Sequence, residues 1–143
     1  MDASRDENLL SAWLCLCGRV KNDRLVKGMS FSEIFVCNIL YKLKDGETVS
    51  ATDIVEQTGM LKSQVNRVLS SLEAKKMIIR RFSLEDRRRI EVMLTEEGAS
   101  IYLSEHRKVL LLMQKICNKL GDAEVDNAVE TLYKLSEAVK EIE

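Results

Sequence analysis

Apolar residues recur every three or four positions along most of the chain, and this spacing predicts a mainly α-helical protein. The first and last stripes are long, and the first covers a broad face, as in a helix that is buried on more than one side. The pattern predicts helices over about 8–25, over 32–43, over a short stretch after Ser50, from about 62 onward, over 95–120, and over a last stretch that ends near 142.

Several predicted helix ends carry residues that satisfy free backbone groups. Ser32 and Thr95 have hydroxyls that can accept hydrogen bonds from first-turn amides, and Ser50 is followed by Asp53, whose charge suits a helix N-terminus. Gly59 supplies the left-handed conformation that helix ends often require. The two helices on either side of Gly59 therefore form a helix-turn-helix candidate.

The periodicity changes after the fourth helix. Residues 77–82 and 90–94 are short runs rich in β-branched or apolar side chains, which predicts two strands. The segment 83–89 between them is too charged to be buried and has a suitable length for a hairpin tip. We therefore expect a mainly α fold with a small β-hairpin wing, that is, a winged helix-turn-helix.

Several classes of protein find no support in the chain. The four cysteines, Cys15, Cys17, Cys37 and Cys117, form no CxxC pair, and His106 is the only histidine, so we expect neither a structural metal nor a cofactor. No arrangement of nucleophile, base and orienting residue is evident, and we do not expect an enzyme. No run of about 20 uncharged apolar residues is present and the N-terminus lacks a signal-peptide layout, so we expect a cytoplasmic protein without membrane contact.

The charge of the chain is unevenly distributed. The net charge is −1, but residues 62–89 hold nine Lys and Arg against three Asp and Glu, which leaves this segment at +6 and the remainder at −7. Attraction to a polyanion depends on the charge of the contacting face, so this segment suits a phosphate-bearing partner. A solvated charged surface is the alternative interpretation.

One face of the predicted helix from residue 62 is polar and, between 62 and 71, free of acidic residues. Such side chains suit the base edges of a DNA major groove, where Arg pairs with guanine and Asn or Gln with adenine. An ordinary solvent face is the alternative, although Glu and Lys usually dominate such faces. The candidate DNA-binding residues of this face are Lys62, Ser63, Gln64, Asn66, Arg67 and Ser70.

The wing tip adds Arg87, Arg88 and Arg89. Three consecutive arginines repel one another, and guanidinium groups suit the negative, narrow minor groove of DNA. We expect Asp86 to hold one arginine through a charge-assisted hydrogen bond and so to fix its direction.

The central part of the chain resembles the MarR family, the multiple antibiotic resistance regulators of bacteria. The resemblance rests on a helix, a wing and a strand-to-helix junction taken together, and the flanking helices match in number, length and order. The matching residues are Ser63 to Glu73 on the helix, Asp86 to Arg88 in the wing, and Val92 to Gly98 at the junction.

The resemblance implies a triangular homodimer whose two winged heads bind successive turns of a palindromic operator in double-stranded DNA. It implies Arg88 as the minor-groove residue, Asp86 as its orienting partner, Arg87 as a phosphate contact and Arg67 as a residue of the recognition helix. The sequence departs from the family at Leu61, where a capping Ser or similar residue is usual.

We expect one MarR-like domain over 1–143, with a DNA-binding head over 30–95 and dimerisation helices over 1–29 and 96–143. The apolar stripes at both ends support a dimer independently, because a small head cannot cover them. A monomer whose terminal helices pack on each other is the alternative.

The leading hypothesis is a DNA-binding transcriptional regulator, a repressor that a small-molecule effector releases. Trp13, Phe31, Phe35, His106 and Arg107 are candidates for an effector crevice, but each also suits a core or surface position, and none is assigned. A winged-helix module that binds another protein is an alternative. A cysteine-based oxidant sensor of the same fold is another, with Cys15 as the candidate redox residue.

Overall fold

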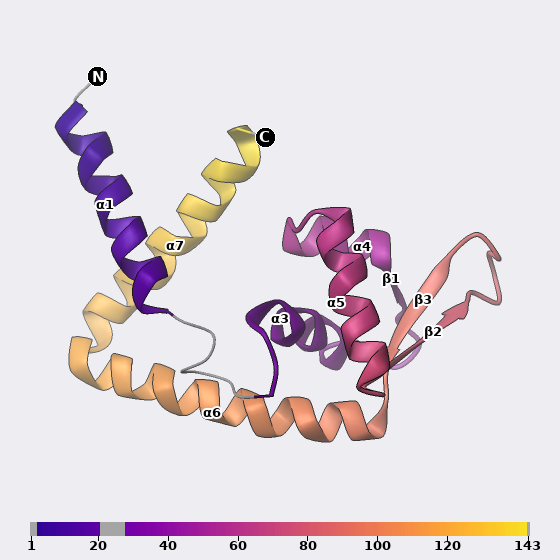
Figure 1. Ribbon diagram of the computed structural model, residues 1–143. Helices are drawn as coiled ribbons and strands as arrows, with labels where there is room; N and C mark the ends of the chain where they lie inside the picture. The colour runs from indigo at the N-terminus through magenta and orange to yellow at the C-terminus, as the bar shows by residue number, and fades with distance from the viewer. Residues whose placement is uncertain (1–2, 21–27, 143) are drawn as a thin grey trace.

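The computed structural model describes residues 3–20 and 28–142. The predicted end of the first helix, up to Leu25, lies outside the described residues. The fold is mainly helical with one small antiparallel sheet, which confirms the expected fold class (Figure 1). The elements are α1 (Ala3–Arg19), α3 (Phe31–Tyr41), β1 (Val49–Ser50), α4 (Ala51–Thr58), α5 (Lys62–Ala74), β2 (Ile78–Phe82), β3 (Ile90–Leu94), α6 (Glu96–Leu120) and α7 (Asp122–Ile142).

The elements form two regions joined by α6. The helices α3, α4 and α5 and the sheet make a compact head, and the hairpin β2–β3 projects from it as the predicted wing (Figure 1). The helix α6 runs from the base of the wing to the opposite end of the molecule, where α7 turns back and α1 also lies. The helix-turn-helix and the wing therefore lie together at one end of the molecule.

The sheet has the strand order β1–β3–β2, and both pairings are antiparallel. The short strand β1 adds to the base of the hairpin, with Val49 opposite Val92. The hairpin register runs from Ile78 opposite Leu94 to Phe82 opposite Ile90. Since β1 leads directly into α4, the sheet couples the wing to the helix-turn-helix.

The core lies inside the head, where the apolar faces of α3, α4 and α5 meet the sheet. Burial of these side chains is the main stabilising contribution to the head. From α6, Tyr102 enters this core, and its phenol donates a hydrogen bond to Oδ1 of Asn38 on α3 (2.8 Å). Burial raises the pKa of the Tyr102 phenol, which favours this donor form. The fully buried side chains are those of Val36, Cys37, Val49, Ile54, Val65, Leu69, Leu72, Met77, Ile78, Val92 and Tyr102.

The junction between the head and α6 is closely packed. The backbone amide of Thr95 donates to the carbonyl of Met77 (2.9 Å), and the Thr95 hydroxyl donates toward the carbonyls of Lys76 (2.8 Å) and Met77 (3.1 Å). The same hydroxyl accepts from the amide of Gly98 (2.9 Å), which confirms Thr95 as the cap of α6. A Cβ atom at Gly98 would collide with the Met77 backbone.

Some helix ends differ from the sequence-based expectation. The cap of α3 is Ser30, whose hydroxyl accepts from the amide of Glu33 (3.1 Å), and Ser32 is already the second residue of the helix. Ser30 and Ser32 both have hydroxyls that satisfy the local rule for a helix cap. The path of the preceding chain makes Ser30 the cap. The capping box of Ser50 and Asp53 is present, and Gly59 has a φ of 71°, as predicted.

The apolar spacing of the sequence places Leu61 on the inward side of α5 together with Val65, Leu69 and Leu72. This expectation is wrong, because Leu61 precedes the first helical turn and is 73% exposed. Its side chain makes no capping hydrogen bond.

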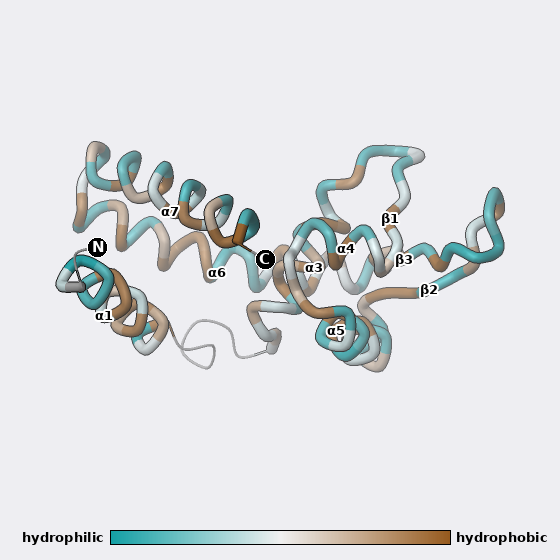
Figure 2. The backbone as a smooth tube through the Cα atoms, turned by 90° about the horizontal axis from the view of Figure 1, so that it is seen from above, coloured by the Kyte–Doolittle hydropathy of each residue, from teal (hydrophilic) through white to brown (hydrophobic). Residues whose placement is uncertain are grey.

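The helices α1, α6 and α7 leave much apolar surface uncovered (Figure 2). All of the described side chains of α1 and almost all of those of α7 are exposed, although both helices have a clear apolar stripe. The exposed members include Leu9, Leu10, Trp13, Leu14 and Leu16 on α1, Leu110, Leu111 and Leu120 on α6, and Val129, Leu132, Tyr133 and Val139 on α7.

None of the helices within residues 3–20 and 28–142 is both long and apolar enough to cross a membrane.

We predict that Gly98→Ala lowers the free energy of unfolding by about 1 to 3 kcal/mol, because the added methyl group must displace the Met77 backbone. Chemical denaturation followed by circular dichroism measures the loss. Gly18→Ala is the matched control, since a Cβ atom there meets open space and alanine favours the helix, so stability should not fall. Equal stabilities of the two variants would contradict the close packing at the junction.

Candidate nucleic-acid interface

The polar face of α5 is available for contact with a partner. Lys62, Ser63, Asn66 and Arg67 are exposed, and among the described residues none of these four side chains makes a hydrogen bond or ion pair. They are unpaired because the opposite face of α5 holds the helix against the core through Val65, Val68, Leu69 and Leu72. The helix is therefore fixed while its polar face stays free.

The two other candidates on α5 are partly engaged. The Gln64 amide nitrogen lies 3.4 Å from the hydroxyl of Ser32 on α3, a long contact that still leaves the amide oxygen open. The Ser70 hydroxyl accepts a hydrogen bond from Arg80 of β2 (3.0 Å). The Arg80 guanidinium also lies 3.4 Å from the carboxylate of Glu73. Ser70 therefore links the polar face of α5 to the wing.

The wing tip is a hydrogen-bonded turn. The Ser83 hydroxyl accepts from the amides of Glu85 (3.2 Å) and Asp86 (3.4 Å), and the Ser83 amide donates to the carbonyl of Arg89 (2.8 Å). A carboxylate oxygen of Asp86 accepts from the backbone amide of Arg88 (2.9 Å). Asp86 thus fixes the main chain that carries Arg88.

The hydrogen bond expected between Asp86 and one arginine is present, but its donor is the backbone amide of Arg88 and not a guanidinium group. Within the described part of the chain, the guanidinium groups of Arg87 and Arg88 have no ion-pair partner. A two-residue separation brings a carboxylate to the following backbone amide more readily than to a long, solvated side chain.

The arginine whose side chain is held is Arg89. Its Nη2 lies 2.5 Å from Oδ2 of Asp53 at the start of α4. That same carboxylate oxygen accepts from the Ser50 amide (2.9 Å) in the capping box. Sequence reasoning identified Asp53 as a cap and missed this second role, because 36 residues separate the partners and only the sheet brings them together.

Hydrogen bonding, burial and a neighbouring charge together shift the pKa of Asp53. The hydrogen bond from the Ser50 amide lowers the pKa of this carboxyl most, partial burial opposes it, and the Arg89 guanidinium lowers it further. The Asp53 carboxylate is therefore ionised at neutral pH and joins the wing to α4.

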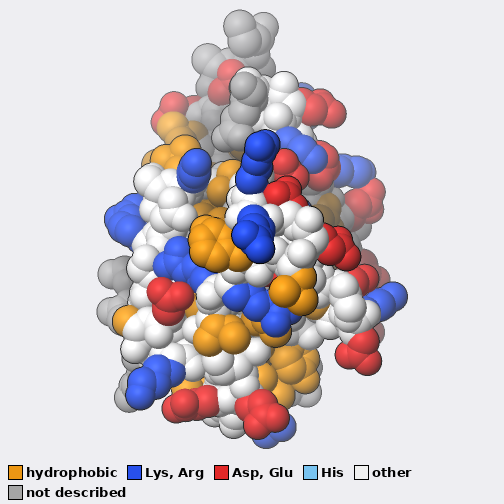
Figure 3. All heavy atoms as spheres, turned by 90° about the vertical axis from the view of Figure 1, so that its right-hand side faces the viewer, with side chains coloured by type: hydrophobic (Ala, Val, Ile, Leu, Met, Phe, Trp, Pro, Cys, Tyr) orange, Lys and Arg blue, Asp and Glu red, His pale blue; other side chains and the backbone are white. Residues whose placement is uncertain are grey.

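Ion pairs neutralise some of the cations in the basic segment 62–89. Lys75 pairs with Glu33 (2.7 Å), Arg81 lies 3.5 Å from Glu91, and Arg80 and Arg89 are paired as described. Five cations of the segment remain without an ion-pair partner in residues 3–20 and 28–142: Lys62, Arg67, Lys76, Arg87 and Arg88. Figure 3 shows Lys and Arg side chains gathered with hydrophobic side chains on the wing end of the molecule.

The other candidate residues named from the sequence do not form a common site. Cys15 is exposed on α1, and Cys37 is buried, where desolvation and the nearby Glu33 raise the pKa of its thiol to about 12. The structure groups no three His, Cys, Asp or Glu side chains of its described residues as a metal site. His106 is half-buried beside Tyr102, with its Nδ1 3.3 Å from the phenol oxygen.

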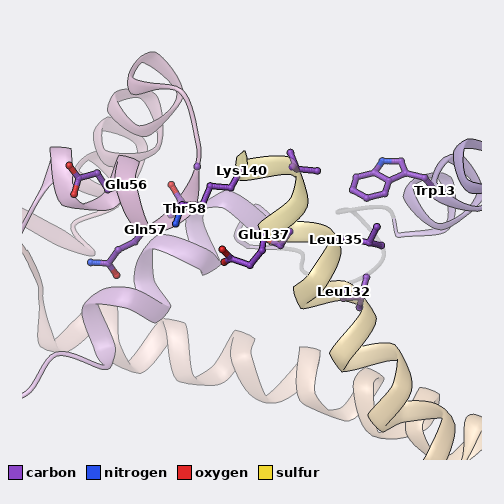
Figure 4. Close-up of a pocket in the computed structure, with 11 residues that line it drawn as sticks. Trp13, Glu56, Gln57, Thr58, Leu132, Leu135, Glu137 and Lys140 are labelled. Carbon is purple, nitrogen blue, oxygen red and sulfur yellow. The ribbon is translucent and has the colours of Figure 1, made fainter. Parts of the chain in front are cut away.

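A cleft of about 510 Å³ lies between the C-terminal turn of α4, the C-terminal half of α7 and α1 (Figure 4). Trp13 is the one residue of the unassigned effector set that lines it. Leu132 and Leu135 of α7 point toward the indole, whereas Glu137 and Lys140 point toward α4. Phe31, Phe35, His106 and Arg107 lie elsewhere.

The fold and this surface define a winged helix-turn-helix protein, and comparison with known proteins shows which family it is similar to. Residues 27–89 match the model described as the MarR family. The uncharacterised HTH-type transcriptional regulator YfiV of Bacillus subtilis is 30% identical over 102 residues, which cover 71% of this chain and 64% of YfiV. The central part of the chain is therefore similar to the MarR family, and the chain spans less than two thirds of the length of YfiV.

Two solved structures show the same fold. A structure of BpsR from Bordetella bronchiseptica, described with the regulation of its DNA binding by 6-hydroxynicotinic acid, has 25% identity, a TM-score of 0.68 and 76% coverage of both chains. MepR of S. aureus, solved as a DNA complex, has 20% identity, a TM-score of 0.77, and coverage of 91% of this chain and 97% of its own. YfiV is described as a transcriptional regulator, in agreement with the sequence-based expectation of a regulator.

We predict that Asp53→Asn lowers the free energy of unfolding at neutral pH by about 1 kcal/mol, because the capping box and the ion pair lose their charge. The folded pKa of Asp53 is lowered, so its contribution is complete above the unfolded value near 4 and is lost as the pH falls through the folded pKa. The stability gap between the two proteins should therefore close below about pH 4 in denaturant titrations.

Arg89→Ala separates the two roles of Asp53, because it removes the ion pair and leaves the capping box intact. A gap for Asp53→Asn that stays constant from pH 7 to pH 3 would contradict the ionic origin of the effect.

Proposed function

We propose that the protein is a sequence-specific DNA-binding transcriptional regulator, a repressor that binds a palindromic operator as a homodimer. The observation that carries the proposal is the set of unpaired donors on two elements at one end of the molecule. Arg67 and Asn66 project from α5, and Arg87 and Arg88 from the wing, while neighbouring cations are neutralised by ion pairs. Cations without an internal partner are those that can displace counterions from DNA.

In this proposal α5 enters the major groove. Gln64, Asn66 and Arg67 face the base edges, and Lys62, Ser63 and Ser70 contact bases or phosphates beside them. The wing reaches the adjacent minor groove with Arg88, and Arg87 contacts a phosphate. Asp86 and Arg89 act through position: Asp86 fixes the backbone of Arg88, and Arg89 anchors the wing to α4.

The dimer follows from the uncovered helices. The exposed apolar side chains of α1, α6 and α7 lie at the end opposite the wing, where a second copy can cover them without blocking α5 (Figures 1 and 2). Stripes of this length are rarely left in water by a soluble monomer. We therefore assign residues 30–95 to the DNA-binding head, and 1–29 and 96–143 to dimerisation.

An effector site is also part of the proposal. BpsR is described with regulation of its DNA binding by 6-hydroxynicotinic acid. The cleft at Trp13 combines an indole and leucines with the charged groups of Glu56, Glu137 and Lys140, of which the Lys140 ammonium group can pair with an acid. This chemistry suits a small aromatic acid. The cleft adjoins the end of α4, so an occupant can displace the helix-turn-helix relative to α7.

Selection of binding sites from random duplex DNA tests the proposal. We expect an inverted repeat with half-sites about one helical turn, roughly 10 base pairs, apart. Affinity for the selected duplex should fall steeply with salt, as counterion release requires. Competition by aromatic acids then tests the effector. Affinity that stays constant between low and moderate salt would contradict the proposed function.

Single arginine variants test the two DNA-contacting elements. Arg67→Ala should relax base preference, and Arg88→Ala should weaken binding through lost minor-groove contact, each by about 1 to 3 kcal/mol. Fluorescence anisotropy with the selected duplex measures both. Arg5→Ala on α1 removes the same charge far from the wing and is the control. Wild-type affinity of Arg88→Ala would contradict the proposed contact between the wing and the minor groove.

A further inference from the structure

The wing carries apolar side chains at its most exposed point. Leu84 is 95% exposed and Phe82 is 65% exposed, and both belong to a hairpin whose tip residues from 85 to 89 are all charged. Together with Ser83 and Arg87 they line a shallow hollow of about 490 Å³. Figure 3 shows orange and blue side chains intermixed on this end of the molecule.

The backbone under Leu84 is well defined. The two amides that follow it, those of Glu85 and Asp86, both donate to the Ser83 hydroxyl, and the Ser83 amide bonds across to Arg89. A turn with these hydrogen bonds holds its side chains in one direction, which lowers the entropy lost when they bind. Leu84 is therefore presented outward, where it contributes almost nothing to the core.

We propose that Leu84 and Phe82 pack against the deoxyribose rings that form the wall of the minor groove, beside a phosphate held by Arg87. This inference rests on the proposed DNA-binding function and adds an apolar contact to it. It assigns to the wing a second mode of binding, in which uncharged sugar carbons are removed from water.

The charges around the tip favour this occupant. Arg87 attracts a phosphate to one side of the hollow, and the Glu85 carboxylate next to Leu84 repels one. An occupant must therefore be anionic near Arg87 and uncharged near Leu84. One sugar–phosphate unit of the DNA backbone has this alternation.

The position of the tip also favours DNA over a second copy of the chain. The hollow shares Arg87 with the proposed interface and lies in the same loop as Arg88, so a duplex that receives Arg88 already passes beside Leu84. The apolar faces suited to a second copy lie at the other end of the molecule (Figure 1).

Salt dependence separates the two kinds of contact. An arginine that leaves a phosphate reduces the slope of log K against log salt by about 1. Apolar contact with a sugar displaces no counterion, so its loss lowers the affinity equally at every salt concentration.

The experiment measures the affinity of Leu84→Ala for the selected duplex at several salt concentrations. We expect about tenfold weaker binding, from the burial of roughly two methylene equivalents, with the salt slope of the wild type. Leu84→Ile keeps the apolar area and should bind as the wild type does. Arg87→Ala should show the contrasting result, a shallower slope.

Three outcomes overturn the inference. Wild-type affinity of Leu84→Ala shows that the side chain does not contact DNA. A changed salt slope shows that it acts by repositioning Arg87 or Arg88. Fluorescence of 2-aminopurine in the duplex that rises with the wild-type protein shows insertion between bases instead of packing on sugars. If the wild type selects no duplex at all, the proposed function fails instead, and the two failures are thereby distinguished.

Discussion

The first turn of α6 meets the turn between α5 and β2 so closely that a hydrogen atom is the largest group that fits at residue 98. The Met77 carbonyl accepts from the backbone of Thr95, while the Thr95 hydroxyl caps α6 and reaches the same turn. This contact fixes the direction in which the long helix leaves the head. In a dimer built on α1, α6 and α7, that direction sets the distance between two copies of α5, and hence the half-site spacing that the protein can read. The hydrogen bond between Tyr102 and Asn38 supports the same joint one turn further along α6.

The second constraint is electrostatic. If all cations of the basic segment 62–89 were free, their positive potential would be diffuse. Carboxylates of the head and sheet neutralise some of them. Lys75, Arg80, Arg81 and Arg89 are held by carboxylates, which positions the wing against α4 and α5. Four of the five unpaired cations, Lys62, Arg67, Arg87 and Arg88, then lie on α5 and the wing tip. Some cations are held in ion pairs and others are left free on the outer surface. A chain with a net charge of −1 can therefore present a locally positive surface.

Much of the fold follows from local patterns, and its failures have physical causes. The capping box at Ser50, the left-handed Gly59 and the Thr95 cap were predictable because each depends on residues within four positions. The choice of Ser30 over Ser32 as a cap was not, since both satisfy the same local rule and the preceding chain decides between them. The apolar character of Leu61 predicted burial, but a residue that precedes the first helical turn has no fixed face.

The candidate site shows the same division between local and long-range information. The acid-free face of α5 could be derived from helical spacing alone. The partner of Arg89 could not, because strand pairing brings Asp53 to the base of the wing and no local pattern records that pairing. The exposure of Leu84 could not be derived from the wing sequence either, because it depends on the turn that Ser83 closes. A wing that combines guanidinium groups with a fixed apolar tip would retain part of its affinity when salt screens the phosphates, because removal of sugar surface from water is insensitive to counterions. The wing is therefore best understood as a preorganised surface of two chemistries, and its run of arginines is only the more visible of them.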